Sequence, residues 1–293
     1  MFSIIKPYIF SLDPETAHDL AIKSLKFNIL PKNLFKLENE HLLEINLLSK
    51  KLKNPIGIAA GFDKSAEVYN SLFKLGFGFV EVGTITPKRQ SGNPKPRVFR
   101  LENDKALINR LGFNNDGLNI VKKRILRNSP NGFLGINIGP NSDTKNKSDD
   151  FIKCISDLEN LGNYITVNIS SPNTEGLRDF HDEKNFEKLL NTINKFRFSK
   201  SIRKPVLLKI SPDINEGEIQ NIVETTLKYK INGLIISNTT EKNREKLTDK
   251  KKMETGGLSG LPLQQRSTLM IKKFYRLIKN RIPIIGVGGV DSG

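Results

Sequence analysis

The sequence predicts an α/β fold of the TIM (β/α)8 type, in which parallel strands alternate with covering helices. Short apolar runs rich in β-branched residues recur along most of the 293 residues. Amphipathic segments separate these runs, as in parallel sheets covered by helices. A doubly wound sheet would show the same alternation. The barrel is favoured because nearly every run ends in polar or glycine residues, which suits strands whose C-terminal ends converge on one site.

Seven of these runs are expected to be strands. They span residues 54–61, 79–85, 132–138, 165–170, 205–210, 233–238 and 283–289. Between them, segments such as 66–75 and 216–228 have the apolar spacing of helices. A barrel of this type has eight strands, and the sequence ends just after the seventh run. We therefore expect a barrel truncated at its C-terminal end.

The first fifty residues follow a different pattern. Residues 1–10 are very apolar, and Asp13, Pro14 and Glu15 then supply an N-cap, a first-turn proline and a first-turn acid. This combination predicts the start of a helix. We expect two short helices and a connector to about Lys53. The chain then divides into an N-terminal helical segment, residues 1–50, and a barrel, residues 51–293.

The apolar start also suggests contact with a membrane surface. Lys23 and Lys26 flank the apolar face of the second expected helix, as in segments that lie in the membrane interface. The alternative is a pair of helices packed on the barrel. We expect no spanning helix, because no segment has roughly 20 uninterrupted apolar residues. We also expect no signal peptide, because Lys6 and Pro7 interrupt the apolar start. The apolar side chains concerned are Phe2, Ile4, Ile5, Tyr8, Ile9 and Phe10.

Composition narrows the classes of function. The 47 basic and 31 acidic residues give a net charge of +16. The basic residues are spread along the chain without an arginine-rich stripe, which favours compositional drift over a nucleic-acid partner. The single cysteine, Cys154, excludes a disulfide framework and a thiolate metal site. The three histidines stand far apart, so we expect no metal centre.

Two lysines are candidate site residues. Lys64 ends the segment Ala60-Gly61-Phe62-Asp63-Lys64 at the end of the first strand, in which the small residues Ala60 and Gly61 would let a planar ligand approach the backbone. It could contact an anion or a flavin, or it could be a surface lysine at a helix start. Lys209 lies inside an otherwise apolar strand. Burying an ammonium is costly unless it is paired, so this position indicates a functional role.

Amides and glycines gather at the predicted strand ends. Side-chain amides are both donors and acceptors, which suits a ring with alternating N–H and C=O groups. Glycine clusters at 256–260 and 286–289 occupy the last two loops, where barrels commonly bind phosphate through backbone N–H groups. The amides are those of Asn109, Asn137, Asn168, Asn173 and Asn238.

These motifs resemble those of the dihydroorotate dehydrogenases. NISSPNT at 168–174, followed by Gly176, Leu177 and Arg178, is similar to the catalytic-loop signature of that family. AAGFDK, GTITPK, NRLGFNN, SNTT, GGLSG and GVGG resemble the family's other motifs, in its order. The membrane-associated, quinone-reducing class has a serine as catalytic base where the soluble classes have cysteine. Ser171 stands at that position.

The resemblance implies an activity and a set of roles. It implies oxidation of dihydroorotate to orotate in de novo pyrimidine (UMP) biosynthesis. Ser171 would take the C5 proton while a hydride leaves C6 for the N5 of FMN, and Thr174 would relay the proton. Electrons would then pass to a membrane quinone near His18 and Arg100. LDPETAH at 12–18 resembles the quinone-tunnel extension of this class, and Arg100 in PRVFRL matches an arginine that lies near the quinone in this class.

The resemblance also assigns binding residues. The FMN contacts would be Ala60, Gly61, Lys64, Thr84, Asn137, Asn168, Lys209, Ser237, Gly260 and Gly289. Orotate or dihydroorotate would be held by Lys64, Asn109, Asn168, Asn173, Asn238 and Thr239, and the loop Arg110, Leu111, Gly112 and Phe113 would close the pocket.

Two other functions remain open at this point. A tRNA-dihydrouridine synthase is also an FMN barrel and would account for the basic charge, but that family needs a catalytic cysteine. Cys154 lies on a predicted helix, away from the strand ends. A non-catalytic, basic membrane-surface protein is the second alternative. With the favoured function we expect a monomer, peripheral at the cytoplasmic face of the inner (plasma) membrane, without a nucleic-acid partner.

Overall fold

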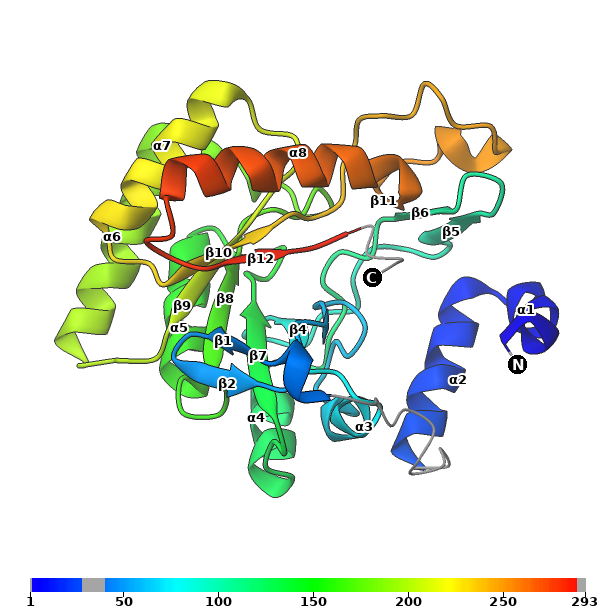
Figure 1. Ribbon diagram of the computed structural model, residues 1–293, viewed down its shortest axis with the longest axis horizontal. Coiled ribbons are helices and arrows are strands. Elements are labelled where there is room, and N and C mark those ends of the chain that lie inside the picture. The colour runs from blue at the N-terminus through cyan, green and yellow to red at the C-terminus, as the bar shows by residue number, and fades with distance from the viewer. Residues whose placement is uncertain (1, 28–39, 289–293) are drawn as a thin grey trace.

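A parallel sheet forms the centre of the computed structural model, which describes residues 2–27 and 40–288 (Figure 1). The strand order is β12-β10-β9-β8-β7-β4-β3, and every neighbouring pair is parallel. The seven expected strands are confirmed, although the first is only two residues long. Their bounds are β3 Gly57–Ile58, β4 Phe79–Ile85, β7 Phe133–Ile138, β8 Tyr164–Asn168, β9 Val206–Ile210, β10 Gly233–Ile236 and β12 Ile284–Gly286.

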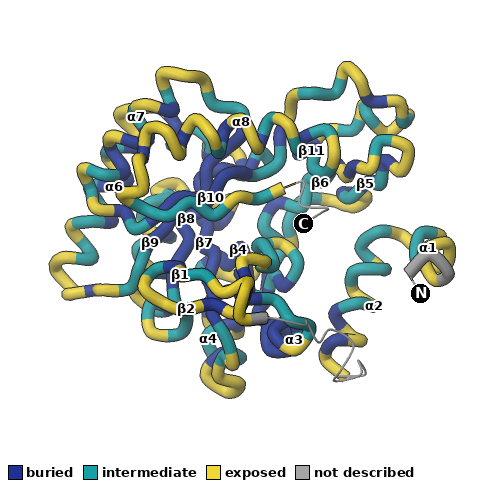
Figure 2. The backbone as a smooth tube through the Cα atoms, viewed as in Figure 1, coloured by how far each residue is buried: buried dark blue, intermediate teal, exposed yellow. Residues whose placement is uncertain are grey.

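Helices cover the outer face of this curled sheet. Alternate strand residues such as Val80, Ile136 and Leu208 pack against apolar helix residues such as Phe151 and Phe274 in one large core. Figure 2 shows the central strands of the sheet buried and much of the helix surface exposed. The covering helices are α3 Tyr69–Lys74, α4 Leu118–Arg127, α5 Lys147–Leu158, α6 Glu183–Ser199, α7 Glu216–Lys228 and α8 Leu261–Ile278.

The inward-facing residues form two layers of different polarity. The lower layer is apolar and consists of Phe79, Phe133, Tyr164, Leu207 and Ile235. Because side chains alternate along a strand, the residue two places on from each of these also faces inward. On β4, β8 and β9 these positions are Glu81, Thr166 and Lys209, all buried. The C-terminal end of the barrel interior is therefore polar.

An antiparallel hairpin closes the apolar end of the interior. β1 (Ile45–Leu47) pairs with β2 (Lys50–Leu52), and Leu47 and Leu52 pack on the lower layer. A 3₁₀ turn, η1 (Glu40–Leu43), precedes it. The connector expected up to about Lys53 contains this hairpin, which was not predicted. The turn residues Leu48 and Ser49 have positive φ. Asn-Gly is the usual signal for such a turn, and its absence here explains why the hairpin was not predicted.

A second, small antiparallel sheet stands beside the C-terminal end of the barrel. It has the order β11-β6-β5, with β5 Val98–Leu101, β6 Ala106–Asn109 and β11 Gly257–Gly260. The expectation that residues 256–260 form a glycine loop was wrong for 257–260, which pair with β6. A Cβ at Gly257 would lie 1.9 Å from the Thr239 hydroxyl. Close packing thus accounts for at least this glycine.

Two N-terminal helices are present, as expected (Figure 1), and α2 contacts α3 and β5 of the small sheet. They are α1 (Phe2–Ser11) and α2 (Pro14–Lys26). The Asp13 side chain caps α2 by accepting hydrogen bonds from the N–H groups of Glu15 and Thr16. Ile22 and Leu25 of α2 are buried. Among the described residues, no helix is long and apolar enough to cross a membrane.

Candidate active site

One cavity, of about 1260 Å³, runs from the polar end of the barrel to the N-terminal helices. Lys209 and Asn168 line it at the barrel end, and Lys6 and Phe10 of α1 line it at the other end. β5 and β6 border it between these ends. A single space therefore connects the strand ends with the helices for which the sequence predicted quinone access.

Most of the predicted site residues line this cavity. Asn137, Ser237, Arg110 and Thr174 do not line it, and Gly289 lies outside the described residues. The predicted residues that do line it are His18, Ala60, Gly61, Lys64, Thr84, Arg100, Asn109, Leu111, Gly112, Phe113, Asn168, Ser171, Asn173, Lys209, Asn238, Thr239 and Gly260.

Lys209 carries a buried charge at the end of the cavity inside the barrel. Its side chain projects inward from β9, and the residue is 5% exposed. Among the described residues, no hydrogen-bond acceptor contacts its ammonium group. Burial lowers the pKa of Lys209, and the negative charge of Glu81 opposes that shift. A cation at a cavity wall without a bonded partner fits a ligand that develops negative charge, such as a flavin ring when it is reduced.

Glu81 anchors a buried polar network beside Lys209. Its carboxylate accepts hydrogen bonds from the Asn137 amide at 2.9 Å and the Thr166 hydroxyl at 2.8 Å. The Asn137 Oδ1 accepts from the Thr84 hydroxyl at 2.7 Å and the Asn168 amide at 3.2 Å. Glu81 thereby fixes which way the Asn137 amide faces. Asn137 lies one layer beneath the cavity and orients the two residues that do line it.

The backbone near Gly61 leaves room for a flat ligand. Gly61 has a φ of +110°, and an added Cβ would meet nothing within 4 Å, so open space lies above it. Burial lowers the pKa of the neighbouring Lys64, opposed by the charges of Glu15 and Asp19. Phe113 also lines the cavity and packs on the barrel at Gly139. A Cβ at Gly139 would lie 2.7 Å from its ring, so glycine is needed for this contact.

Ser171 lies at the cavity, on the loop that follows β8. It is 5% exposed, and its Oγ accepts a hydrogen bond from the Asn173 N–H at 3.2 Å. The Asn173 amide in turn donates to the Asn109 Oδ1 at 3.3 Å. The Thr174 hydroxyl is buried and has no hydrogen-bond partner among the described residues. Its part as a proton relay stays a prediction.

At the other end of the cavity, α2 and β5 carry the two predicted quinone-site residues. His18 bonds through Nε2 to the Phe62 carbonyl at 2.8 Å, which makes this nitrogen the N–H donor. Burial lowers the pKa of His18, and the charge of Lys64 lowers it further. Arg100 donates to the Leu12 carbonyl at 2.8 Å and lies 4.7 Å from the centre of the Phe10 ring.

Arg110 contacts the small sheet and its neighbours rather than the cavity. Its guanidinium donates to Glu254 at 2.8 Å and to the Pro96 carbonyl at 2.9 Å, and it stacks 4.6 Å from the centre of the Phe99 ring.

The sequence analysis did not identify Glu81 as a site residue. It is a charged residue inside an apolar strand, the same signal that identified Lys209.

Comparison with known proteins assigns the family. The family model described as dihydroorotate dehydrogenase matches residues 42–293. A relative from Chelativorans, named dihydroorotate dehydrogenase (quinone), is 44% identical over 294 residues, with 99% of this chain and 80% of the relative covered. The mitochondrial enzyme of that name from Mus musculus is also 44% identical, with 96% of this chain and 73% of the relative covered.

Solved structures agree with this assignment. The crystal structure of a dihydroorotate dehydrogenase from Eimeria tenella in complex with ferulenol has a TM-score of 0.88 and 37% sequence identity. The match covers 96% of this chain and 81% of that chain. The chain therefore belongs to the dihydroorotate dehydrogenase family, with relatives of the quinone-dependent class.

Proposed function

We propose that this chain oxidises dihydroorotate to orotate in pyrimidine biosynthesis, with FMN as bound cofactor and a membrane quinone as electron acceptor. One observation carries the proposal. A single cavity contains the inward-facing Lys209 and the loop serine Ser171 at one end, and His18 and Arg100 at the other. Substrate oxidation and quinone reduction need such a connection, because the two reactions share one cofactor.

The barrel end of the cavity has the groups that FMN needs. When bound, FMN accepts a hydride equivalent from the substrate and passes electrons on to the quinone. Lys209 would stabilise the negative charge of the reduced ring, because a fixed ammonium in a dry site acts strongly on charge that develops nearby. Gly61 leaves room for the ring plane, and Thr84 and Asn168 offer polar contacts at its edge. Ser237, Gly260 and Gly289 would complete the cofactor site.

Ser171 would act as the base that removes the C5 proton. A hydroxyl oxygen has two lone pairs and one proton. The Asn173 N–H occupies one lone pair, which leaves the second to accept the substrate proton. The hydroxyl proton of Ser171 must then leave, and Thr174, whose buried hydroxyl has no hydrogen-bond partner among the described residues, would accept it as the relay. This step keeps the proton count balanced at Ser171.

Amides would recognise the substrate ring. Dihydroorotate has two ring N–H groups, two ring carbonyls and a carboxylate. Asn109, Asn173 and Asn238 each offer a donor and an acceptor for the ring, and the Thr239 hydroxyl offers both as well. The ammonium of Lys64 would offset the carboxylate. Phe113, with Leu111 and Gly112, would close over the bound ring.

The N-terminal helices would meet the membrane. Ile5, Tyr8, Leu12 and Leu20 are exposed, and a peripheral helix pair buries such side chains among lipid headgroups. We therefore assign residues 1–50 to quinone access and membrane association, and residues 51–293 to the FMN barrel. The protein would act as a monomer at the cytoplasmic face of the inner membrane.

The position of the cysteine argues against the tRNA-dihydrouridine synthase. Cys154 is buried in α5, outside the residues that line the cavity. Burial raises its pKa, whereas a catalytic thiol is exposed to its substrate.

A two-step experiment tests the proposal. The purified protein is loaded with FMN and mixed anaerobically with dihydroorotate, and the visible flavin absorbance should fall in a single turnover. A water-soluble quinone should then restore it. A protein that binds FMN tightly but is not reduced by dihydroorotate would refute the assigned substrate.

A further inference from the structure

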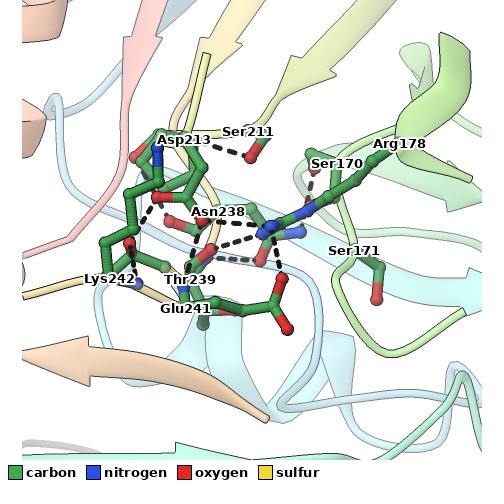
Figure 3. Close-up of polar contacts among 12 residues, drawn as sticks. Ser170, Ser171, Arg178, Ser211, Asp213, Asn238, Thr239, Glu241 and Lys242 are labelled. Atoms are coloured by element: carbon green, nitrogen blue, oxygen red, sulfur yellow. Dashed lines mark hydrogen bonds and ion pairs between the residues drawn. The ribbon is translucent and has the colours of Figure 1, made fainter. Parts of the chain in front are cut away.

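Arg178 joins three loops at the polar end of the barrel (Figure 3). It lies on the catalytic loop after β8, at the start of the 3₁₀ turn η2 (Arg178–His181). Its guanidinium donates to Asp213 on the loop after β9 at 3.0 Å and to Glu241 on the loop after β10 at 2.8 Å. It also donates to two backbone carbonyls, those of Ser170 at 3.3 Å and Thr239 at 3.2 Å.

The partners of Arg178 are themselves fixed. Asp213 accepts hydrogen bonds from the Thr240 hydroxyl and from the Glu241 N–H. Arg266 on α8 also lies 3.6 Å from Asp213. The Asp213 side chain is 9% exposed, so its charge is shielded from water and its pairing is not an ordinary surface contact. Arg178 therefore binds to a carboxylate whose position other groups hold.

The backbone of the catalytic loop is anchored on its other side by His181. Its Nδ1 bonds to the Arg178 carbonyl at 3.0 Å, and its Nε2 accepts the Ser211 N–H at 3.3 Å. Because Nε2 is an acceptor, the ring is neutral with its proton on Nδ1. Burial lowers the pKa of His181 to about 4, so the ring stays neutral at physiological pH.

This arrangement links the proposed base to the proposed substrate amides. Ser170, directly before Ser171, has its carbonyl bonded to Arg178. Its hydroxyl accepts from the Asn238 amide at 2.9 Å and donates to Asn168 at 2.8 Å. Arg178 itself is not among the residues that line the cavity, whereas Ser171 and Thr239 are. Figure 3 shows Ser171 pointing away from the Arg178 cluster.

We propose that Arg178 is a positioning residue for the proposed reaction, which sets the distance between Ser171 and the substrate ring held by Asn238 and Thr239. The inference rests on the proposed function. Arginine suits this role because its planar guanidinium group has several N–H donors, which can bond two carboxylates and two carbonyls from different loops at once. A shift of about 1 Å between a base and its substrate proton can slow a reaction about a hundredfold.

The test compares Arg178→Ala and Arg178→Lys with the matched control Arg266→Ala. Arg266 contacts the same Asp213 carboxylate and the Pro212 carbonyl, but no residue of the catalytic loop. In anaerobic single turnovers, flavin reduction at saturating dihydroorotate should slow about 10- to 100-fold in Arg178→Ala and less in Arg178→Lys. It should stay within about twofold of the wild type in Arg266→Ala. Guanidinium ion added to Arg178→Ala should restore part of the rate.

A second readout does not depend on turnover. Amide hydrogen exchange at residues 170–178 should become faster in Arg178→Ala with FMN bound, and it should be unchanged in Arg266→Ala. If Arg178→Ala does not fold, Arg178→Lys carries the same comparison. Equal flavin reduction rates and equal exchange in the Arg178 and Arg266 variants overturn the inference. A wild-type protein that dihydroorotate does not reduce refutes the proposed function instead, so the two failures are distinguishable.

Discussion

The ion pair between Glu15 and Arg97 should control whether the N-terminal helices stay docked on the barrel. Arg97 donates to the Glu15 carboxylate through Nε at 3.0 Å and through an Nη at 2.9 Å. The two side chains are only 14% and 7% exposed. Breaking a buried pair by removing one charge costs about 3–5 kcal/mol. The low end applies here, because Arg97 keeps its bonds to the Ser91 and Asn93 carbonyls.

This energy is comparable to the apolar contribution that holds α2 in place. Ile22 and Leu25 are its two buried apolar side chains, and burial of each contributes about 1.5–3 kcal/mol. Glu15→Gln keeps the shape of the side chain and removes its charge. We expect a loss of about 3 kcal/mol, or about a hundredfold in the ratio of docked to undocked helix.

The assay separates the two half-reactions. In Glu15→Gln, reduction of FMN by dihydroorotate should stay near the wild-type rate, and reoxidation by a long-tailed quinone should slow about tenfold or more. Trypsin should also cut near Lys23 and Lys26 sooner. The control is Lys95→Met, because Lys95 lies 3.8 Å from Glu15 with its side chain 64% exposed, and such a surface pair contributes about 0–1 kcal/mol. Normal quinone reoxidation together with an unchanged tryptic pattern in Glu15→Gln would show that the ion pair does not dock the helices.

Three further predictions follow from the site. Ser171→Ala should retain FMN and slow flavin reduction by dihydroorotate about 10²–10⁴-fold, and stopped-flow absorbance would expose a near-normal rate that contradicts its role as base. Lys209→Met should lower the flavin reduction potential, because a cation that favours the reduced ring is lost. Dye equilibration measures this potential, and an unchanged value would show that Lys209 has only a structural role. For His181, burial lowers the pKa in the folded protein to about 4, below the ordinary histidine value of about 6.5, so the unfolded state binds more protons between these two pH values. Stability should therefore fall as pH drops from about 6.5 to about 4, by up to about 3 kcal/mol, and urea titrations of His181→Gln should lack this part of the decline unless another group causes it.

The parallel sheet could be predicted from sequence because its signal is local and repeated. Each buried strand is a continuous apolar run with a helix pattern after it, as in residues 205–228. The small sheet β11-β6-β5 could not be predicted, because its pairing joins residues about 150 positions apart. Its strand β11 is Gly-Leu-Ser-Gly, a composition that favours turns over strands.

Some residues of the site could likewise be predicted from the sequence, and others could not. Lys209 and the strand-end asparagines were identified because polar residues within or at the ends of apolar strands have few structural reasons to be there, and Ser171 was identified because its loop resembles the family's catalytic-loop signature. The contacts of Arg178 and Arg97 are different, since each arginine bonds to loops or helices far away in sequence. An arginine next to a loop is common in any protein surface, so only the folded arrangement distinguishes these two from solvated side chains.

Arg97 also connects the two ends of the cavity. Its guanidinium bonds to Glu15 on α2 and to the Asn93 carbonyl, and the Asn93 amide donates to the Arg110 carbonyl at 2.9 Å and the Asn173 carbonyl at 3.4 Å. A short chain of polar contacts therefore runs from the proposed quinone helix to the proposed substrate loop. Since FMN would be shared by both half-reactions, a rigid link between these elements keeps the quinone and the substrate at constant positions relative to one ring. The docking of α2 and the geometry around Ser171 then depend on the same buried guanidinium.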